Sequence, residues 1–363
     1  MTCMNVMYAA DDGYAEIAGV SIESLLDKNR DVESITIFFV EDRISEENKS
    51  SLNRTVEKYK RKIEFIPKPD IRSLCGTELT TLRWSDSAYS RLYLDVVFKD
   101  YPDIHKLLYL DCDTLIVDSL EDLWNEDVGD YLGAAVFECM SNMHKRIIGA
   151  KPSDNYINTG VILFNVDRWK AEKVSKLCTE FIKKYRGSTE YVDQGVINGT
   201  VSNRFKIVNP RYNLTALSWD FSYEEMQVYR KPDHGYSKEV WEEAKKHPAV
   251  IHFTTSFLSI RPWLEGSSTP WTIKWREYKA QSEWKDEPLR TTKKSSSRKI
   301  KAFNMLPRKA GIAVAGALHA YAKPVVYELK AKWGGESDKV VHLSNNSRRT
   351  YVVTTNIYEE VAA

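Results

Sequence analysis

Two carboxylates directly follow an apolar stretch about a third of the way along the chain. Residues 107–110 are apolar, and Asp111 and Asp113 come next. Such a run is typical of a buried strand, and open α/β sheets bind ligands at the carboxyl ends of their strands. Side chains two residues apart in extended backbone point to the same side, so both carboxylates could bind one Mg²⁺ or Mn²⁺ ion. These ions share their shell with substrate phosphates, which indicates a diphosphate-bearing substrate.

The same residues allow other interpretations. A solvated turn in which Asp113 caps the next segment fits the spacing, although so apolar a strand has little reason to end in two adjacent negative charges. The run is also similar to the nucleophile motif of haloacid-dehalogenase-type phosphatases. That family has threonine two residues after the second aspartate and its motif near the N-terminus, whereas Thr114 follows Asp113 directly, beyond residue 100.

A second pair of carboxylates, Asp11 and Asp12, follows the first apolar run of the chain. Asp11 could accept the imide N–H of a uracil ring, because the backbone at Ala9 and Ala10 would let a base approach closely. The alternative is that Asp11 or Asp12 caps the following helix.

Strands and helices are predicted in alternation. Strands are expected at residues 5–10, 34–40, 63–66, 107–110, 115–117, 131–137, 158–165 and 250–253, and helices at 14–26, 46–59, 85–97, 118–124, 169–185 and from 193 onward. This alternation predicts an α/β fold with a largely parallel, Rossmann-like sheet flanked by helices. The stretch between residue 209 and the last strand is expected to be irregular. Arg91 lies off the apolar face of its helix, so it is either exposed to solvent or directed at a diphosphate.

The composition is that of a folded protein. The 363 residues, 42% of them apolar, suffice for one large or two medium domains. The first residues lack the basic region of a secretory signal, so we expect a cytoplasmic protein. Five widely spaced cysteines argue against a disulfide framework or a zinc site.

The overall charge of +1 hides an uneven distribution. Residues 290–332 carry eleven basic side chains and one acidic one, a net charge of +10, so the rest of the chain carries −9. A basic tract at 293–301 precedes a mostly small, apolar stretch at 310–322 that is too short to span a bilayer. We expect this extension to lie on an anionic membrane surface, on the inner face of the cell membrane, which suits a lipid-linked acceptor. The tract lacks the interleaved aromatic side chains of a nucleic-acid site.

Two other C-terminal features remain. Trp271, Trp275 and Tyr278 stand at helical spacing beside basic residues, which favours core packing of a terminal helix. Residues 339–358 have the pattern of a hairpin, to which we assign no function.

Five short motifs then occur in a characteristic order. They are Tyr8-Ala9-Ala10-Asp11-Asp12-Gly13-Tyr14, Tyr109-Leu110-Asp111-Cys112-Asp113, Asn158-Thr159-Gly160-Val161, Asp193-Gln194 and Ile251-His252-Phe253. Together they resemble glycosyltransferase family 8, the retaining galactosyl- and glucosyltransferases typified by bacterial lipooligosaccharide galactosyltransferases and glycogenin. The similarity covers roughly residues 4–284.

The resemblance implies a GT-A fold, which we expect over residues 1–284. The uneven charge predicts that a basic helical extension follows over residues 285–363. By position in the motifs, Asp111, Asp113 and His252 are the implied ligands of one Mn²⁺ or Mg²⁺ ion. A lone histidine is more often structural, but imidazole with two carboxylates and phosphate oxygens suits Mn²⁺.

The resemblance also implies a UDP-hexose donor, UDP-glucose or UDP-galactose. The residues implied to contact it are Ala9, Ala10, Asp11, Arg91, Asp111, Cys112, Asn158, Thr159, Asp193, Gln194 and Arg261. Asn158 would lie at the transferred sugar, Asp193 at its hydroxyls and Gln194 beneath the anomeric carbon.

Asp193 and Gln194 are the implied catalytic residues. An amide oxygen is a poor nucleophile, so we favour attack by the acceptor on the face that the diphosphate leaves, with Gln194 as electrostatic support. The expected activity is hexose transfer to a saccharide or lipid-linked oligosaccharide, in lipopolysaccharide or other cell-surface polysaccharide synthesis.

Three positions depart from the family pattern. Phe253 follows His252 where bacterial members have glycine, Arg261 stands where they have lysine, and Gly13 replaces an amide side chain that often reads the uracil. Arginine can still bind a diphosphate. A sugar-nucleotide-binding protein without turnover therefore remains an alternative.

Overall fold

The structure is a computed structural model that describes residues 2–79, 85–292 and 298–333. Within these residues the main sheet has seven strands in the order β3-β2-β1-β4-β7-β6-β8. In that order the strands are β3 (Lys62–Pro67), β2 (Ser34–Asp42), β1 (Cys3–Asp11), β4 (Lys106–Leu110), β7 (Ile157–Asn165), β6 (Gly133–Phe137) and β8 (Phe205–Val208). All neighbouring pairs are parallel except the two that β7 makes. The predicted α/β class with a mostly parallel sheet is confirmed.

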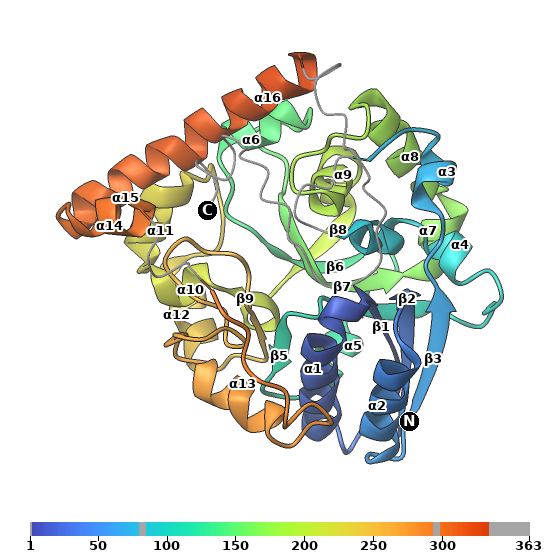
Figure 1. Cartoon of the computed structure of the whole chain (residues 1–363). Coiled ribbons are helices and arrows are strands. Elements are labelled where there is room, and N and C mark those ends of the chain that lie inside the picture. The colour runs from blue at the N-terminus through green and yellow to red at the C-terminus, as the bar shows by residue number, and fades with distance from the viewer. Residues whose placement is uncertain (1, 80–84, 293–297, 334–363) are drawn as a thin grey trace, which may run out of the picture.

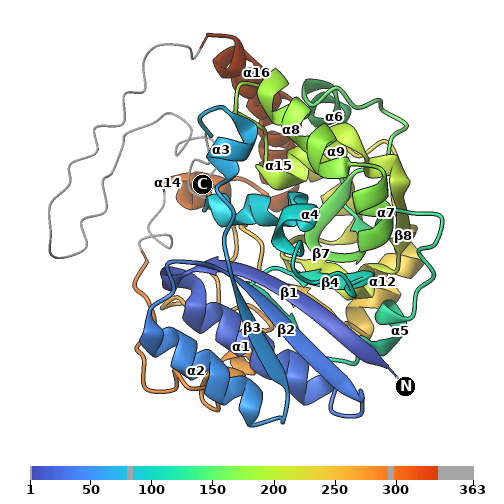
Figure 2. The ribbon, with the colours of Figure 1, turned by 90° about the vertical axis from the view of Figure 1, so that its right-hand side faces the viewer.

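Helices cover both faces of this sheet (Figures 1 and 2). Side chains alternate along β1, so that Val6 and Tyr8 pack on one face and Met7 on the other. The first face is covered by α1 (Ala15–Lys28), α2 (Glu46–Glu57) and α13 (Thr272–Lys279). The second is covered by α3 (Ile71–Cys75), α4 (Leu94–Val97), α7 (Val166–Ala171), α8 (Val174–Lys184) and α9 (Asp193–Thr200).

The aromatic residues near residue 275 belong to the core, as predicted. Trp275 and Tyr278 are only 1% and 4% exposed in α13, where they pack in the cluster that includes α1.

A small second sheet joins two distant parts of the chain. It consists of β5 (Thr114–Ile116), β10 (Val250–His252) and β9 (Leu214–Thr215). β10 runs antiparallel to β5, with His252 opposite Thr114. The pairing therefore brings the end of β10 next to the turn that contains Asp111 and Asp113.

Two predicted helices are wrong in detail. Residues 85–97 form a 3₁₀ helix (Asp86–Leu92) followed by the short α4, because Tyr93 interrupts the helical backbone. Residues 169–185 belong to two helices, α7 and α8, since Lys173 adopts a left-handed φ of 54° between them.

The region expected to be irregular contains three helices, α10 (Leu217–Asp220), α11 (Tyr223–Arg230) and α12 (Lys238–Lys246). Ser222 begins α11 with a capping box to Glu225, a signal that the sequence carried. The remaining short helices are α5 (Glu121–Trp124) and α6 (Asn142–Ile147).

The C-terminal extension forms a long arm along one side of the molecule (Figure 1). It comprises α14 (Arg298–Asn304), α15 (Arg308–Ala317), a π-helical turn (Leu318–Ala322) and α16 (Lys323–Trp333). No helix in the described residues is both long and apolar enough to cross a bilayer. The predicted hairpin at 339–358 lies outside the described residues, and the domain boundary at 284 stays a prediction.

Candidate active site

A cavity of about 640 Å³ opens at the carboxyl ends of β1 and β4. Its walls also come from α9, the loop after β10 and the C-terminal helices. The cavity is lined by every predicted site residue, namely Ala9, Ala10, Asp11, Arg91, Asp111, Cys112, Asp113, Asn158, Thr159, Asp193, Gln194, His252 and Arg261. The fold thus brings them together at one site, while their individual roles stay predictions.

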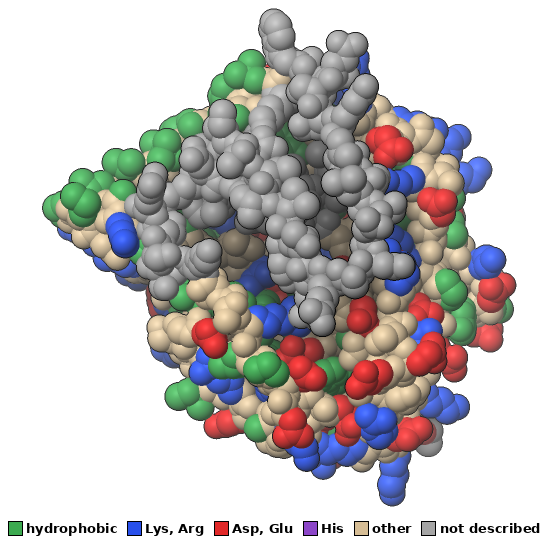
Figure 3. Space-filling model, viewed as in Figure 1, with side chains coloured by type: hydrophobic (Ala, Val, Ile, Leu, Met, Phe, Trp, Pro, Cys, Tyr) green, Lys and Arg blue, Asp and Glu red, His purple; other side chains and the backbone are tan. Residues whose placement is uncertain are grey.

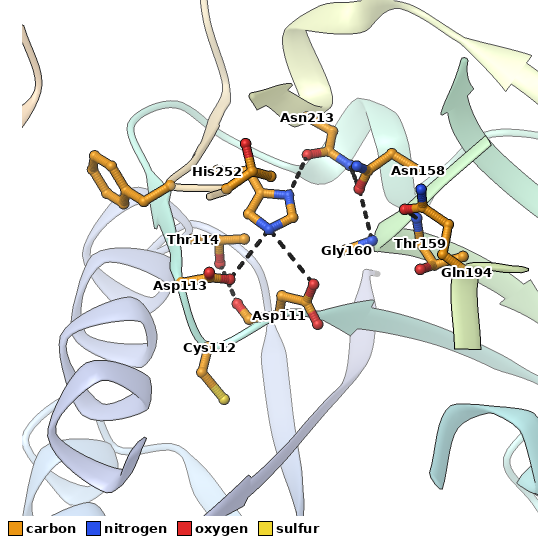
Figure 4. A network of polar contacts seen from close by, with 12 residues as sticks. Asp111, Cys112, Asp113, Thr114, Asn158, Thr159, Gly160, Gln194, Asn213 and His252 are labelled. Carbon is orange, nitrogen blue, oxygen red and sulfur yellow. Dashed lines mark hydrogen bonds and ion pairs between the residues drawn. The ribbon is translucent and has the colours of Figure 1, made fainter. Parts of the chain in front are cut away.

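Asp111, Asp113 and His252 converge in one corner of the cavity (Figure 4). One ligand atom from each lies within 4.8 Å of the other two. Nε2 of His252 is 3.2 Å from Oδ1 of Asp113 and 3.5 Å from Oδ2 of Asp111. Two carboxylate oxygens and an imidazole nitrogen are a ligand set that fits Mn²⁺ and similar divalent ions.

Asn213 fixes the orientation of the histidine. Nδ1 of His252 lies 2.9 Å from Oδ1 of Asn213 and donates to it, which directs Nε2 at the two carboxylates. The Asn213 amide in turn donates to Oδ1 of Asn158. Asn213 was not predicted, because a single asparagine before a short strand has no distinctive pattern.

Gly160 leaves the space that this corner needs. A Cβ atom at Gly160 would lie 2.7 Å from Nδ1 of His252 and 2.8 Å from Oδ2 of Asp111. Real Cβ atoms do not approach neighbours so closely, so any other residue here would displace two of the three ligands.

The charges in this corner balance one another. Burial opposes the charged form of His252, but the adjacent Asp113 and Asp111 outweigh it and raise the histidine pKa. Burial likewise acts to raise the pKa of Asp113, yet His252 and Arg261 hold it below its usual value. Arg261 reaches Oδ2 of Asp113 at 3.2 Å and donates to the hydroxyl of Tyr14, another residue that we did not predict.

Arg91 is buried, so its interpretation as a solvent-exposed residue is wrong. The 3₁₀ turn directs the guanidinium inward, where it is only 4% exposed. It donates to Oδ1 of Asp111 at 2.8 Å and lies 3.3 Å from Oδ2 of Asp193. Arg91 therefore joins the two halves of the site, the acidic turn and the start of α9.

Asp193 and Gln194 occupy the first turn of α9, beside the start of β7. Oδ2 of Asp193 accepts from the hydroxyl of Thr159 at 2.8 Å. Oε1 of Gln194 accepts from the Thr159 backbone N–H at 3.3 Å, and its amide donates to Glu138 at 3.2 Å. Glu138, which also accepts from Asn158 at 2.7 Å, was missed because a single carboxylate after a strand has no distinctive pattern.

The interpretation of Asp11 or Asp12 as a helix cap is wrong. Asp11 makes no capping hydrogen bond at the start of the following 3₁₀ helix. Asp12 accepts from the backbone N–H of Ser45 and the amide of Asn48 instead. Asp11 is thus left on the cavity wall beside Ala9.

Substitution of Gly160 by alanine is expected to weaken Mn²⁺ binding by about tenfold or more, because the added Cβ pushes His252 and Asp111 apart. Isothermal titration of the protein with Mn²⁺ measures the loss. Gly129→Ala is the matched control, since Gly129 lies on an exposed loop and faces only a movable Asp127 side chain. Equal Mn²⁺ affinity in the two variants would contradict this geometry.

Asp193 should make folding depend on pH. Burial raises the pKa of Asp193 to about 6, with Arg91 opposing and Asp111 adding to the effect. Between about pH 4 and pH 6 the folded protein therefore keeps a proton on Asp193 that the unfolded chain has released. The free energy of unfolding falls as the pH rises through this range, and it stays at the lower value above pH 6. The asparagine of Asp193→Asn cannot ionise, so the variant does not lose stability in this way. We therefore expect its free energy of unfolding to exceed that of the wild type by up to about 3 kcal/mol at pH 7.5. The two proteins should converge near pH 4.

Urea unfolding at both pH values measures this difference. A variant less stable than the wild type at pH 7.5 would mean that Arg91 and Thr159 stabilise the carboxylate more than burial destabilises it.

Comparison with known proteins agrees with this geometry. The family described as Glycosyl transferase family 8 matches residues 5–266. A putative glycosyltransferase of Haemophilus influenzae is 31% identical over 226 residues, which cover 60% of this chain and 65% of that protein. A lipopolysaccharide 1,2-glucosyltransferase of Escherichia coli is 24% identical over 316 residues, or 84% of this chain and 86% of the relative.

A solved structure agrees as well. The galactosyltransferase LgtC, in complex with donor and acceptor sugar analogues, is similar with a TM-score of 0.65 and 25% identity, over 77% of this chain and 96% of LgtC. The predicted GT-A fold is thereby confirmed. With a family match over most of its length, the chain belongs to glycosyl transferase family 8.

Proposed function

We propose that this protein is a divalent-metal-dependent, retaining hexosyltransferase that moves glucose or galactose from a UDP-sugar to a saccharide acceptor. The observation that carries the proposal is the convergence of Asp111, Asp113 and His252 within 4.8 Å, in a cavity that also holds Asp193 and Gln194. The three ligands would hold Mn²⁺ or Mg²⁺ against the diphosphate. Arg261, beside Asp113, would bind the same group.

The rest of the cavity offers groups for the nucleoside and the sugar. Asp11 stands beside the small Ala9 and Ala10, where a carboxylate could accept the uracil imide N–H. Cys112 lines the same wall. Asn158 and Thr159, at the start of β7, face the first turn of α9, so the transferred sugar would lie between these elements.

The chemistry follows from the charges that develop. Cleavage of the sugar–phosphate bond leaves positive charge at the anomeric carbon and negative charge on the diphosphate. A bound divalent ion supplies Lewis-acid stabilisation to the leaving diphosphate. The carboxylate of Asp193 is bound by Arg91 and Thr159, which makes it a poor nucleophile. Gln194, held from both ends of its amide, would present a fixed dipole to the anomeric carbon while the acceptor attacks from the leaving-group side.

Release of UDP from UDP-glucose or UDP-galactose tests the proposal. With Mn²⁺ the wild type should hydrolyse one donor slowly even without an acceptor. Asp113→Asn should lose about 100-fold or more in rate, because it removes a charged ligand next to His252. Asp122→Asn is the matched control, because the Asp122 side chain is exposed on α5.

Three outcomes would contradict parts of this mechanism. Donor binding without UDP release would favour the non-catalytic binding protein. Equal rates with and without EDTA would rule out metal dependence. A hexose ester on Asp193, detected by mass spectrometry of the intact protein during turnover, would replace same-face attack by a double displacement.

The acceptor is proposed to belong to a cell-surface polysaccharide. Relatives named as lipopolysaccharide 1,2-glucosyltransferase and 1,3-galactosyltransferase support this class. The apolar part of the cavity also suits an acceptor that carries a lipid. It is lined by Leu217, Phe221, Phe257, Phe303, Leu306 and Val314.

Attachment to an anionic leaflet, at the inner face of the cell membrane, fits the C-terminal arm. Apolar side chains follow its outer edge (Figure 3). The exposed ones include Met305 at 85%, Tyr321 at 51% and Leu329 at 51%. Exposed apolar side chains on a helical segment rich in lysine and arginine are typical of interfacial helices.

Vesicle flotation tests this attachment. The full chain should float with vesicles of phosphatidylglycerol and phosphatidylcholine, and the triple variant Met305→Glu, Tyr321→Glu and Leu329→Glu should float several-fold less. Ile273→Glu is the control, because Ile273 is an equally apolar side chain, 73% exposed, on α13. A triple variant that floats like the wild type would exclude this surface as the membrane contact.

A further inference from the structure

The backbone just before the proposed catalytic residues is strained. Tyr191 and Val192 have φ angles of 55° and 56°, a left-handed conformation that side-chain-bearing residues rarely adopt. Val192 combines it with a ψ of −121°, and a β-branched residue tolerates this region especially poorly. Such backbone conformations are unfavourable and persist only where the surrounding structure holds them. Asp193 and Gln194 follow directly, so whatever holds this turn also sets their position.

The C-terminal arm holds the turn through Tyr191. Nζ of Lys323 donates to the Tyr191 hydroxyl at 2.8 Å and lies 4.3 Å from the centre of its ring. Nε2 of His319 is 3.3 Å from the same hydroxyl. Both contacts come from more than 120 residues further along the chain.

A second series of hydrogen bonds links the arm to the Gln194 side chain. Arg230, at the end of α11, donates to Nε2 of His319 at 3.1 Å and to Glu138 at 3.4 Å. The other carboxylate oxygen of Glu138 accepts from the Gln194 amide at 3.2 Å. His319 is thus the point where the two sets of contacts meet, one leading to the backbone before Asp193 and one to Gln194.

The His319 imidazole is suited to accept a hydrogen bond where these two sets of contacts meet. Burial, with Arg230, His144 and Lys323 adding to it, keeps the pKa of His319 well below its ordinary value. The imidazole is therefore neutral, and the lone pair of Nε2 can accept from the Arg230 guanidinium, with the Tyr191 hydroxyl 3.3 Å away.

The arm is anchored at the same place by close packing. A Cβ atom at Gly316 would lie 2.5 Å from the carbonyl oxygen of Val228, so α15 approaches α11 more closely than a larger residue would allow. Ser141 donates to the carbonyl of Ala320 at 2.9 Å, and His144 donates to the carbonyl of His319 at 3.0 Å. The π-helical turn that carries His319 is consequently fixed on both sides.

We propose that the C-terminal arm is part of the active site, with His319 and Lys323 as positioning residues that hold Tyr191 and the Arg230–Glu138 pair and thereby orient Asp193 and Gln194 toward the donor sugar. This inference rests on the proposed function. The metal and the nucleotide would be held in another part of the cavity, by residues of β1, the Asp111 turn and β10. Loss of the contacts with the arm should therefore slow the chemical step and leave the binding of UDP with Mn²⁺ unchanged.

A double-mutant cycle on the full chain tests the arm. Tyr191→Phe removes only the hydroxyl, and Lys323→Met removes its donor. Each variant should lower kcat for UDP release about tenfold, with the Kd for UDP in the presence of Mn²⁺ changed less than twofold. The double variant should be no slower than the slower single variant, because the Lys323 hydrogen bond needs the Tyr191 hydroxyl that Tyr191→Phe removes. Lys309→Met, an exposed lysine on α15, is the matched control.

Two kinetic results would overturn the inference. The first is a kcat in Tyr191→Phe and Lys323→Met equal to that of Lys309→Met. The second is a loss of UDP affinity in proportion to kcat, because that would indicate general damage to the cavity.

Hydrogen exchange gives a readout that does not need activity. In Lys323→Met the amides of residues 190–196 should exchange faster than in the wild type, while those of β4 keep their rate. Unchanged exchange at 190–196 would overturn the inference. If the wild type releases no UDP from any sugar nucleotide, the proposed function fails, and hydrogen exchange still decides whether the arm holds the turn.

Discussion

The antiparallel pairing of β10 with β5 is the interaction on which the site depends. It sets His252 opposite Thr114, one residue after Asp113. The imidazole of one segment thereby meets the carboxylates of another that is distant in sequence. Asn213 belongs to the same arrangement, because β9 pairs with β10 and starts at the next residue. Backbone pairing in a sheet of three short strands thus positions both His252 and the group that orients it.

Charge compensation is the second constraint. The cavity wall holds four carboxylates close together, those of Asp111, Asp113, Glu138 and Asp193. Three arginines neutralise them, since Arg91 contacts Asp111 and Asp193, Arg261 contacts Asp113, and Arg230 contacts Glu138. Buried ion pairs of this kind contribute little net stability, but they fix side-chain positions before a ligand arrives. The strained turn at Val192 likewise lowers the stability of the fold, but it fixes the position of the residues that follow it.

The C-terminal arm faces two environments. Its inner side carries His319 and Lys323, which contact Tyr191 and Arg230, while its outer side exposes apolar residues such as Met305. The inner side is also partly apolar, since Ile312 belongs to a buried cluster with Phe221, and Phe303 packs against that cluster. An arm that is apolar on both sides is understandable if the inner side serves the cavity and the outer side a lipid surface, as we propose.

Short-range patterns in the sequence predicted the α/β class, most strands and the residues around the cavity. Apolar runs that end in polar residues are local features, and the order of five short motifs indicated the family, so neither needed knowledge of packing. Local patterns were insufficient where the backbone changed its helical form. The 3₁₀ turn buried Arg91, and the left-handed Lys173 divided one predicted helix into two.

Only the tertiary structure determined which distant side chains meet. Glu138, Tyr191, Arg230 and His319 lie on four separate segments, and none of them stands in a recognisable pattern. Their contacts arise from the packing of α15 on α11 at Gly316 and from the strained turn before α9. The sequence by itself therefore determined the strand ends that carry the acidic and amide residues, because hydrophobic burial acts along each segment. The tertiary structure decided what orients those residues, because hydrogen bonds between remote segments depend on how the segments pack.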